Sequence, residues 1–351
     1  MYIKAKDLAN QLGVSPATIS LVLHNKPGIS SALRRSLVDR IKELGYGDML
    51  QETPALPVPL PAQEPPRSFP RRSIAYLIYT ASDEASDRFA FYPAVLEGAE
   101  MQARENNCNL VVFHMNRGGV QRLDTLLNQS GTVMGAIIQA THISPEILED
   151  ISSLQIPCVF IDAYLPSARV SCVCTNNEQG MESVVQYLRD MGHRKIGYVS
   201  SGQDTDCQLE RRRCFHLALR ELGLSGHTEF EFTAKSAGDF ISQWQSREEL
   251  PSALAVENDL LAWHVAKALQ SRGVRIPEDV SITGFDDRSL CTMMEPNLTS
   301  VKNSRHLMGR EAVLLLGNLL QLRQQGLQDL PLKVELPTSL MARDSVRRLA
   351  D

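Results

Sequence analysis

From Ser73 to the end of the chain, short apolar runs alternate with amphipathic segments, and this alternation limits the possible folds more than any other feature. The first half contains the runs SIAYLIY at 73–79, LVVFHM at 110–115, GAIIQA at 135–140 and CVFIDAY at 158–164. A helical pattern from 92 to 105 separates the first two runs. Strands that alternate with helices of this length are typical of parallel sheets joined by helical crossovers. The sequence therefore predicts an α/β fold.

The same alternation restarts after Asp162. Helical patterns at 178–191, 209–222 and 259–273 alternate with the apolar runs KIGYVSS, FEFTA, SALAVEN and VSITGFDD. We therefore expect two lobes, the first from 73–162 plus about 290–325 and the second from 163–289 plus about 326–345. Ligands of open α/β sheets bind outside the carboxyl ends of the strands. The predicted site is a cleft between the lobes, near Asp162, Asn258 and Asp286.

A proline-rich stretch separates these lobes from the N-terminal 46 residues. Prolines occupy positions 54, 57, 59, 61, 65, 66 and 70, and they exclude a regular helix because proline has no amide hydrogen. We therefore predict a semi-rigid linker over residues 47–72. Residues 1–46 carry a net charge of +4, which leaves −9 for the rest of the chain. This asymmetry favours a small unit that contacts phosphate, joined to a larger body that does not.

The stretch SPATISLVL, residues 15–23, predicts the second helix of a helix-turn-helix. Ser15 suits the N-cap, and Pro16 suits the first helical position, where its missing amide hydrogen would have no partner. The residues expected to pack the two helices together are Leu8, Ala9, Leu12, Gly13, Val14, Ile19 and Val22. A third helix, capped by Ser30, is expected to bring Leu33, Leu37, Ile41 and Leu44 to one face and Arg34 and Arg35 near a phosphate backbone. A three-helix dimerisation unit is the alternative interpretation of this segment.

Composition and missing motifs narrow the function. Hydrophobic residues make up 43% of the 351 positions, no run reaches the roughly 20 apolar residues of a membrane span, and MYIKAKDLAN lacks the apolar stretch of a signal peptide. We therefore expect a cytoplasmic protein. The seven cysteines are expected to be reduced and to bind no metal, because Cys172 and Cys174 form CxC rather than paired CxxC motifs. The motifs GxGxxG, GxxxxGK[ST], GxSxG and HExxH are missing, so we expect neither a cofactor nor catalysis.

Residues 3–46 resemble the DNA-binding headpiece of the lactose and galactose repressor (LacI/GalR) family. The resemblance rests on IKAKDLANQLGVSPATISLVLHNKPGISSALRRSLVDRIKELGY and continues through RRSIAYLIY, FYPAVLEGAE, IPCVFID, NNEQGMESVVQYLRDMGHRKIGYV, ERRRCFHLALRELGL, ENDLLAWHVAKALQSRGVRIPEDVSITGFDD and PNLTSV. It implies a three-helix headpiece followed by a two-lobed core like that of periplasmic binding proteins. It also implies a homodimeric transcription regulator, most often a repressor, whose affinity for operator DNA is controlled by a sugar or a sugar derivative.

The resemblance assigns DNA contacts to the headpiece. The recognition helix would present Pro16, Ala17, Thr18, Ser20 and Leu21 to the major groove. Candidates for phosphate contact are Ser15, Thr18, Ser20, Asn25, Ser30 and Arg34. Many members of the family have arginine at the position of Leu21, so this chain is expected to use Leu21 or Ala17 against a thymine methyl group instead. The prolines at 54 and 57 also leave no room for the hinge helix that the family inserts into the minor groove.

The resemblance also assigns effector contacts. Arg211 in ERRRCF, Asn258 in END and Asp286 in GFDD match polar residues that bind ligand hydroxyls in the family, and Asp162 ends a strand of the first lobe. Phe91, Tyr92 or Phe232 would stack on an apolar sugar face. Trp263 and His264 are expected to serve packing. The alternative interpretation of Arg211 and Asp286 is a salt bridge across an empty cleft.

Three other functions remain possible on the residues alone. One is a sugar-binding α/β protein or enzyme with a non-regulatory headpiece, which turnover of a bound sugar would reveal. A periplasmic binding protein is disfavoured because it has no use for a basic headpiece. An architectural DNA-binding protein without a ligand is the third.

Overall fold

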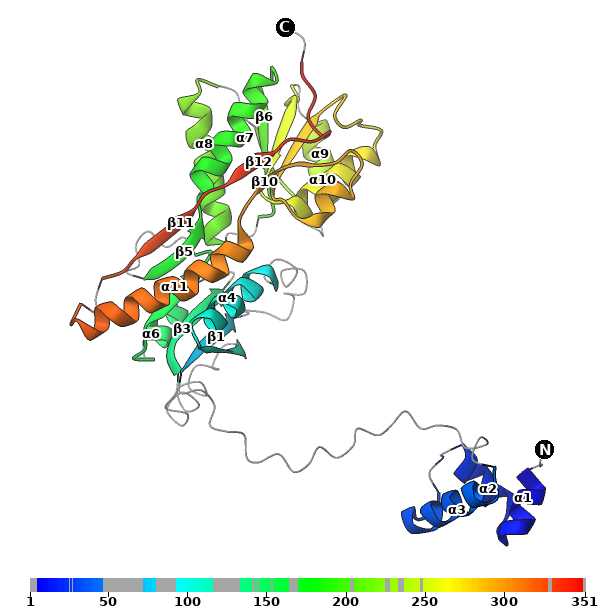
Figure 1. Ribbon diagram of the computed structural model, residues 1–351. Coiled ribbons are helices and arrows are strands. Elements are labelled where there is room, and N and C mark those ends of the chain that lie inside the picture. The colour runs from blue at the N-terminus through cyan, green and yellow to red at the C-terminus, as the bar shows by residue number, and fades with distance from the viewer. Residues whose placement is uncertain are drawn as a thin grey trace. The chain divides into compact units, whose positions relative to one another are not determined.

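The computed structural model describes residues 5–24, 26, 28–46, 72–79, 93–115, 133–140, 143, 145–152, 154–163, 170–202, 205–224, 228–232, 237–246, 249–327 and 330–349. The chain divides into two compact units, Met1–Ser68 and Phe69–Asp351, which are drawn in Figure 1. Residues 47–71 of the predicted linker, and also Asn25, Phe91 and Tyr92, lie outside the described residues.

The N-terminal unit contains the predicted helix-turn-helix. Its helices are α1 (Ala5–Leu12), α2 (Pro16–Leu23) and α3 (Ser31–Glu43). The hydroxyl oxygens of Ser15 and Ser30 accept hydrogen bonds from the amides of Thr18 and Leu33, which caps α2 and α3. The buried core consists of Leu8, Ala9, Leu12, Ile19, Val22, Leu23, Leu37 and Ile41. Of the four residues predicted to share one face of the third helix, Leu37 and Ile41 are buried in this core, whereas Leu33 in the first turn of α3 and Leu44 at its C-cap are 43% and 46% exposed.

The first lobe of the larger unit is a parallel sheet of six strands in the order β11-β5-β4-β3-β1-β2. The strands are β1 (Ser73–Tyr79), β2 (Asn109–Met115), β3 (Val133–Ala140), β4 (Cys158–Ile161), β5 (Ser171–Thr175) and β11 (Lys333–Leu336). Helices α4 (Pro93–Glu105) and α11 (Arg305–Gln324) pack on one face, and α6 (Pro145–Ser152) packs on the other. The continuous burial of β1 is typical of a strand covered on both faces.

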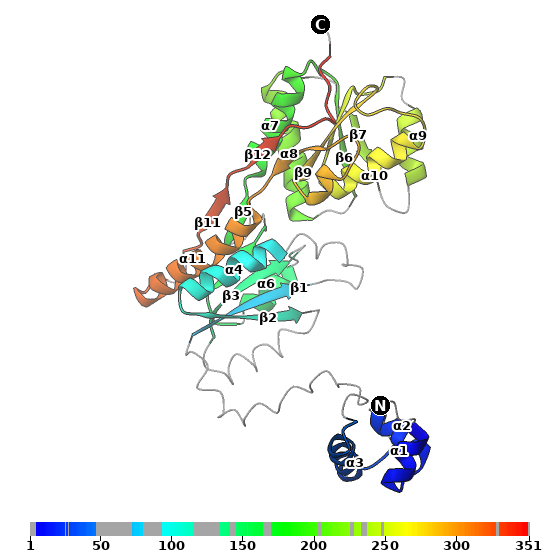
Figure 2. The ribbon, with the colours of Figure 1, turned by 45° about the vertical axis from the view of Figure 1, so that its right-hand side comes forward.

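The second lobe repeats this architecture in the order β12-β10-β9-β8-β6-β7. Its strands are β6 (Ile196–Ser200), β7 (Thr228–Glu231), β8 (Ala253–Val256), β9 (Ser281–Asp286), β10 (Thr299–Lys302) and β12 (Ser339–Met341), the last of which runs antiparallel to β10. Helices α7 (Asn177–Asp190) and α8 (Asp206–Glu221) cover one face, and α9 (Ala237–Gln245) and α10 (Asp259–Gln270) cover the other. Figure 2 shows the two sheets and their helices as separate layers.

The predicted division between the lobes is wrong for three strands. β5 belongs to the first sheet although residue 163 was expected to begin the second lobe, β10 belongs to the second sheet, and β11 belongs to the first. Over the described residues the chain therefore crosses between the lobes after β5, after β10 and after β11. The physical reason is that a strand pairs with whichever sheet edge it reaches, and an apolar run such as SCVCT does not specify that edge.

Helices α4 and α11 cross at unusually short range. A Cβ atom placed on Gly98 would lie 1.9 Å from the carbonyl oxygen of His306, and one on Gly309 would lie 1.9 Å from that of Val95. The two glycines let the backbones approach each other, and Arg310 then donates hydrogen bonds from α11 to Gln102 and Glu105 of α4. The two helices lie side by side in both ribbon views.

His193 attaches the C-terminal segment to the second lobe. Its side chain is fully buried, with Nε2 3.1 Å from the carbonyl oxygen of Arg347 and Nδ1 2.8 Å from the hydroxyl of Ser252. Because a carbonyl only accepts, Nε2 carries the hydrogen and the neutral ring fits both partners. Burial lowers the pKa of His193.

We expect the free energy of unfolding to fall as the pH drops below about 6.5, the ordinary pKa of imidazole. Below this pH the unfolded chain binds a proton at His193 that the folded protein resists, so protonation favours unfolding. Urea denaturation of the wild type and of His193→Gln at pH 7.5 and 5.5 measures the effect. The variant should lose less stability than the wild type on acidification, and an equal loss in both would contradict the assignment.

Candidate functional site

The exposed face of α2 is the candidate DNA-reading surface. Pro16, Ala17 and Ser20 are exposed, and Leu21 is half-buried. The hydroxyls of Ser15 and Thr18 lie 2.8 Å apart, and Ser15 also caps the helix. These two hydroxyls are therefore engaged within the helix, and the freely presented groups are those of the three exposed residues.

Arg34 connects α3 to the end of α2. Its Nη1 donates a hydrogen bond to the carbonyl oxygen of Leu21 at 2.8 Å, and its Nη2 donates to that of Lys26. Gly28 has φ +131° and leaves only 3.1 Å between an added Cβ and Leu21 Cδ1. The guanidinium, which the sequence suggested as a phosphate contact, thus holds the recognition helix in position. His24 is the C-cap of α2 and is exposed.

Arg211 is the centre of the polar site in the second lobe. It extends from α8 and is 4% exposed. Its Nε donates to Asn177 Oδ1 at 3.1 Å, its Nη1 to the carbonyl oxygen of Glu257 at 3.0 Å, and its Nη2 to Asp286 Oδ1 at 3.1 Å. The guanidinium carbon lies 3.9 Å from the centre of the Phe285 ring, within the range of a cation–π contact.

Asp286 and Asn303 complete this cluster from the ends of neighbouring strands. Asp286 ends β9, has φ 106° and is 7% exposed. Asn303 follows β10, is 4% exposed, and donates from Nδ2 to Asp286 Oδ1 at 3.1 Å. Arg211 and Asp286 form the ion pair that was the alternative interpretation of these residues, but within the second lobe rather than across the cleft; their predicted contact with a ligand stays a prediction. Asn177 and Asn303 were missed because nothing in a single sequence distinguishes them from other asparagines.

A second carboxylate lies beside the ion pair. Glu257 is 1% exposed, and its Oε1 accepts hydrogen bonds from Gln208 at 2.9 Å and from Asn258 at 3.2 Å. Asn258 also caps α10 through Oδ1, which accepts from the amide of Leu261 at 2.9 Å. Asn258 lies two residues after the end of β8, and its Oδ1 already accepts one hydrogen bond, from α10; its predicted contact with a ligand stays a prediction.

Burial and neighbouring charges shift the pKa values of these buried groups. Burial opposes the charge of Arg211, but Asp286 and Asp162 outweigh it and hold its pKa above the ordinary value. Burial raises the pKa of Asp286, and Arg211 opposes the shift; because a guanidinium keeps its proton and needs a counter-charge, we treat the pair as ionised. Burial, with a contribution from Asp286, raises the pKa of Asp259 to about 7.

Asp162 is the contribution of the first lobe. It follows β4 with φ 52°, and its Oδ1 accepts a hydrogen bond from Thr175 at 3.3 Å. The thiol of Cys207 on α8 donates to its carbonyl oxygen at 2.5 Å, and the amide of Ile143 donates to Asp206 Oδ2 at 3.4 Å. The first turn of α8 therefore touches the first lobe, which brings Asp162 toward the residues of the second.

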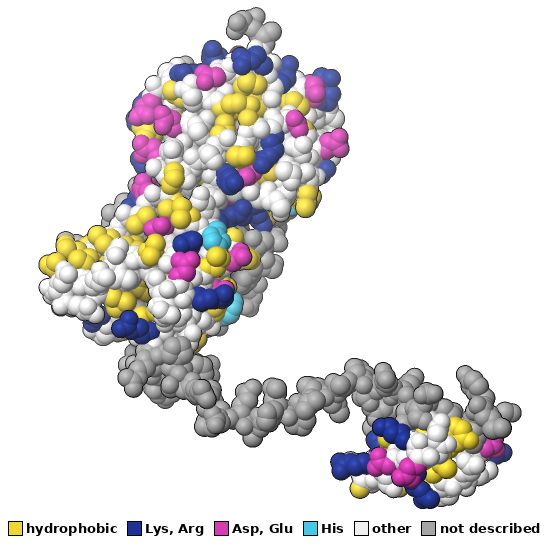
Figure 3. Space-filling model, viewed as in Figure 1, with side chains coloured by type: hydrophobic (Ala, Val, Ile, Leu, Met, Phe, Trp, Pro, Cys, Tyr) yellow, Lys and Arg dark blue, Asp and Glu magenta, His cyan; other side chains and the backbone are white. Residues whose placement is uncertain are grey.

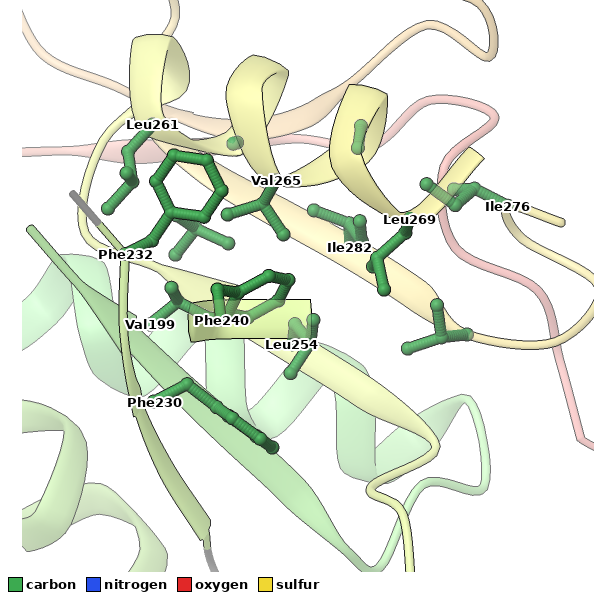
Figure 4. Close-up of a cluster of buried hydrophobic side chains, with 14 of the residues drawn as sticks. Val199, Phe230, Phe232, Phe240, Leu254, Leu261, Val265, Leu269, Ile276 and Ile282 are labelled. Atoms are coloured by element: carbon green, nitrogen blue, oxygen red, sulfur yellow. The ribbon is translucent and has the colours of Figure 1, made fainter. Parts of the chain in front are cut away.

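Phe232 belongs to the core rather than to an open wall. It is 3% exposed, with ring centroids 5.4 Å from Phe240 and 6.2 Å from His264. Figure 4 shows it among the apolar side chains under α10. The predicted stacking on a ligand therefore has no exposed ring face available. His264 packs as expected, whereas Trp263 is 37% exposed.

No described helix is both long and apolar enough to span a membrane. No group of three or more His, Cys, Asp or Glu side chains in the described part is arranged to hold a metal ion.

Known families match both units of the chain. The model for bacterial regulatory proteins of the lacI family matches residues 4–47, and the model for a periplasmic binding protein-like domain matches residues 185–346. The transcriptional regulator CelR of Thermobifida fusca is 28% identical over 347 residues, which is 95% of each chain. Catabolite control protein A of Priestia megaterium is 26% identical over 322 residues, 90% of this chain and 92% of its own.

Solved structures agree with these matches. The complex of the regulator CelR with cellobiose has a TM-score of 0.66 at 26% identity and covers 98% of this chain and 100% of its own. The lac repressor dimer bound to operator and the anti-inducer ONPF has a TM-score of 0.63 at 23% identity, covers 99% and 100%, and supports the fold alone. The helix-turn-helix, the two-sheet core and these matches along nearly the whole length lead to one conclusion: the chain combines a DNA-binding domain of the lacI family with a periplasmic binding protein-like domain.

Proposed function

We propose that this protein is a transcriptional repressor whose affinity for operator DNA is controlled by a sugar or sugar derivative bound between the two lobes. The observation that carries the proposal is the buried cluster of Arg211, Asp286 and Asn303 at the carboxyl ends of β9 and β10. Charged and amide groups preorganised at strand ends fit the hydroxyls of a polar ligand. The relatives named above are regulators, so the proposal assigns no catalysis, and it places the protein in the cytoplasm with the DNA.

The DNA contacts follow from the exposed face of α2. Ala17 and Leu21 would contact thymine methyl groups, and Ser20 would hydrogen-bond a base edge. Ser30, Pro16 and the neighbouring polar residues would position the helix against the phosphates. With no lysine or arginine in α2, base recognition rests on small side chains and on the shape of the groove.

We propose a homodimer, because two headpieces are needed to read two successive major grooves. The larger unit offers an apolar surface for the contact. Met101 of α4 and Leu307 and Leu314 of α11 are 39%, 37% and 38% exposed, and Figure 3 shows hydrophobic side chains gathered over α11. Isolated monomers would leave these side chains in water.

Control by a ligand requires that the ligand bind one conformation of the protein better than another. DNA and ligand then change each other's affinity by the same factor. Solved structures of similar regulators contain cellobiose, glucose, sucrose or ribose. These four sugars form the first panel to test.

The test is fluorescence anisotropy with DNA from upstream of the protein's own gene, over a salt series, with and without each sugar of the panel. We expect sequence-selective binding, a slope of log K against log salt near −0.9 per neutralised phosphate, and a shift of at least fivefold with one sugar. Ser20→Glu should weaken operator binding by more than tenfold, because it brings a carboxylate into the groove.

The matched control is Ser36→Glu, which makes the same change at an exposed position of α3. Sedimentation of the same samples should give a dimer. Binding to the operator no tighter than to random DNA, in the presence and in the absence of every sugar, would refute the proposed function.

A further inference from the structure

Asn303 contains a buried hydrogen-bond acceptor that the described part of the chain leaves unused. Its Oδ1 is buried and has no hydrogen-bond partner among the described residues, whereas Nδ2 donates to Asp286. A buried acceptor without a partner is unfavourable unless a water molecule or a ligand satisfies it. Such atoms are uncommon in folded proteins, so this one calls for a specific explanation.

The orientation of the amide is fixed by its neighbour. Exchanging the oxygen and nitrogen of Asn303 would point an acceptor at the carboxylate of Asp286, and two acceptors repel each other. The unfilled oxygen must therefore point away from Asp286 Oδ1. Rotating the amide cannot satisfy it without breaking the 3.1 Å bond.

The neighbouring carboxylate of Asp286 can accept further hydrogen bonds as well. Both hydrogen bonds that Asp286 accepts from described side chains, from Arg211 and from Asn303, end on Oδ1. Asp286 Oδ2 and Asn303 Oδ1 are thus two acceptors on one pair of contacting side chains. A ligand group that fits between them has to donate hydrogen, as a hydroxyl does and a phosphate or carboxylate oxygen does not.

The position of Asn303 in the fold also suits a contact with a ligand bound between the lobes. It follows β10, where Lys302 pairs with Asp286 of β9, and it precedes α11, which packs on the sheet of the first lobe. It therefore lies on one of the segments that connect the two lobes.

We propose that Asn303 is a ligand-contacting residue whose Oδ1 accepts a hydrogen bond from a hydroxyl of the bound effector. The proposal rests on the function given above and adds a recognition residue and a chemical requirement to it. The part of the effector that meets Asn303 is a hydroxyl-bearing carbon, so removing that hydroxyl removes the contact.

The experiment is calorimetry on the full-length protein with the sugar of the panel that binds most tightly and with its monodeoxy derivatives. Asn303→Leu should weaken the parent sugar by about tenfold, as expected for one lost hydrogen bond in a buried site. One deoxy derivative should bind the wild type about as weakly as the parent sugar binds Asn303→Leu. The affinity of that derivative should be the same for the wild type and for the variant. This double-mutant cycle separates direct contact from a general effect on the site.

A fallback substitution and a matched control complete the experiment. Asn303→Ala replaces the leucine if that variant fails to fold. Asn297→Leu is the matched control, because Asn297 also donates to a carboxylate, that of Asp344 at 2.9 Å, but lies half-buried and away from the cluster; it should bind sugar like the wild type.

The outcomes are distinguishable. The inference is wrong, and the proposed function stands, if the Asn303 variants bind the sugar with an affinity within twofold of the wild type. The same holds if removing any one hydroxyl from the sugar lowers its affinity for the variants as much as it lowers its affinity for the wild type. If no sugar binds and none shifts DNA affinity, the sugar-controlled function fails and the inference fails with it.

Discussion

Replacing Arg211 with methionine should lower the free energy of unfolding by about 3–5 kcal/mol and reduce sugar affinity by at least 100-fold. The substitution leaves the carboxylate of Asp286 buried without its counter-charge, and it also removes donors from Asn177 and from the carbonyl oxygen of Glu257. Guanidinium chloride denaturation and calorimetry measure the two effects.

A second substitution separates stability from binding. In Arg211→Met combined with Asp286→Leu, both charges are replaced by apolar groups, so most of the lost stability should return while sugar binding stays absent. Arg104→Met is the surface control, because its ion pair with Glu100 is 73% and 51% exposed and contributes less than about 1 kcal/mol. Equal stability of Arg211→Met and Arg104→Met would contradict the role given to the buried pair.

Gly309→Ala should destabilise the larger unit by about 3 kcal/mol or more, although alanine is normally the better helix former. The added methyl group would lie 1.9 Å from the carbonyl oxygen of Val95 and 2.6 Å from the amide nitrogen of Ala99, so α4 and α11 would have to separate. Thermal and urea unfolding followed by circular dichroism measure the loss.

The same helix provides the control. Gly317 also lies in α11, and a Cβ there meets nothing within 4 Å. Gly317→Ala should therefore raise stability by about 0.5–1 kcal/mol. If the two substitutions changed stability in the same direction and by the same amount, the close helix crossing would not be what requires Gly309.

Local chemistry made much of the fold predictable. Ser15 and Pro16 define the start of α2 through capping and a fixed φ, and the alternation of apolar runs identifies a parallel sheet. The path between the lobes was not predictable in this way, because β5, β10 and β11 are assigned by which sheet edge they reach. Leu33 and Leu44 show the same limit, since periodicity gives a helix face but not how far its partner helices extend along it.

The candidate site was predicted in part. Asp286 was predicted at the end of a strand, and the family resemblance assigned both Arg211 and Asp286 to the ligand site. The sequence could not show that the oxygen of Asn258 caps α10, or that Phe232 is covered by Phe240 and His264. Nor could it select Asn303, whose significance depends on an oxygen atom without a partner, which only the folded chain reveals.

The glycine-mediated contact between α4 and α11 has a mechanical consequence. It makes the two helices one stiff arm, which begins two residues after Asn303. A helix of 20 residues is about 30 Å long, so a tilt of about 5° at its first turn displaces its far end by about 2.6 Å. A movement at Asn303 too small to break its bond to Asp286 would thus be magnified into a displacement of about 2.6 Å at the far end of α11.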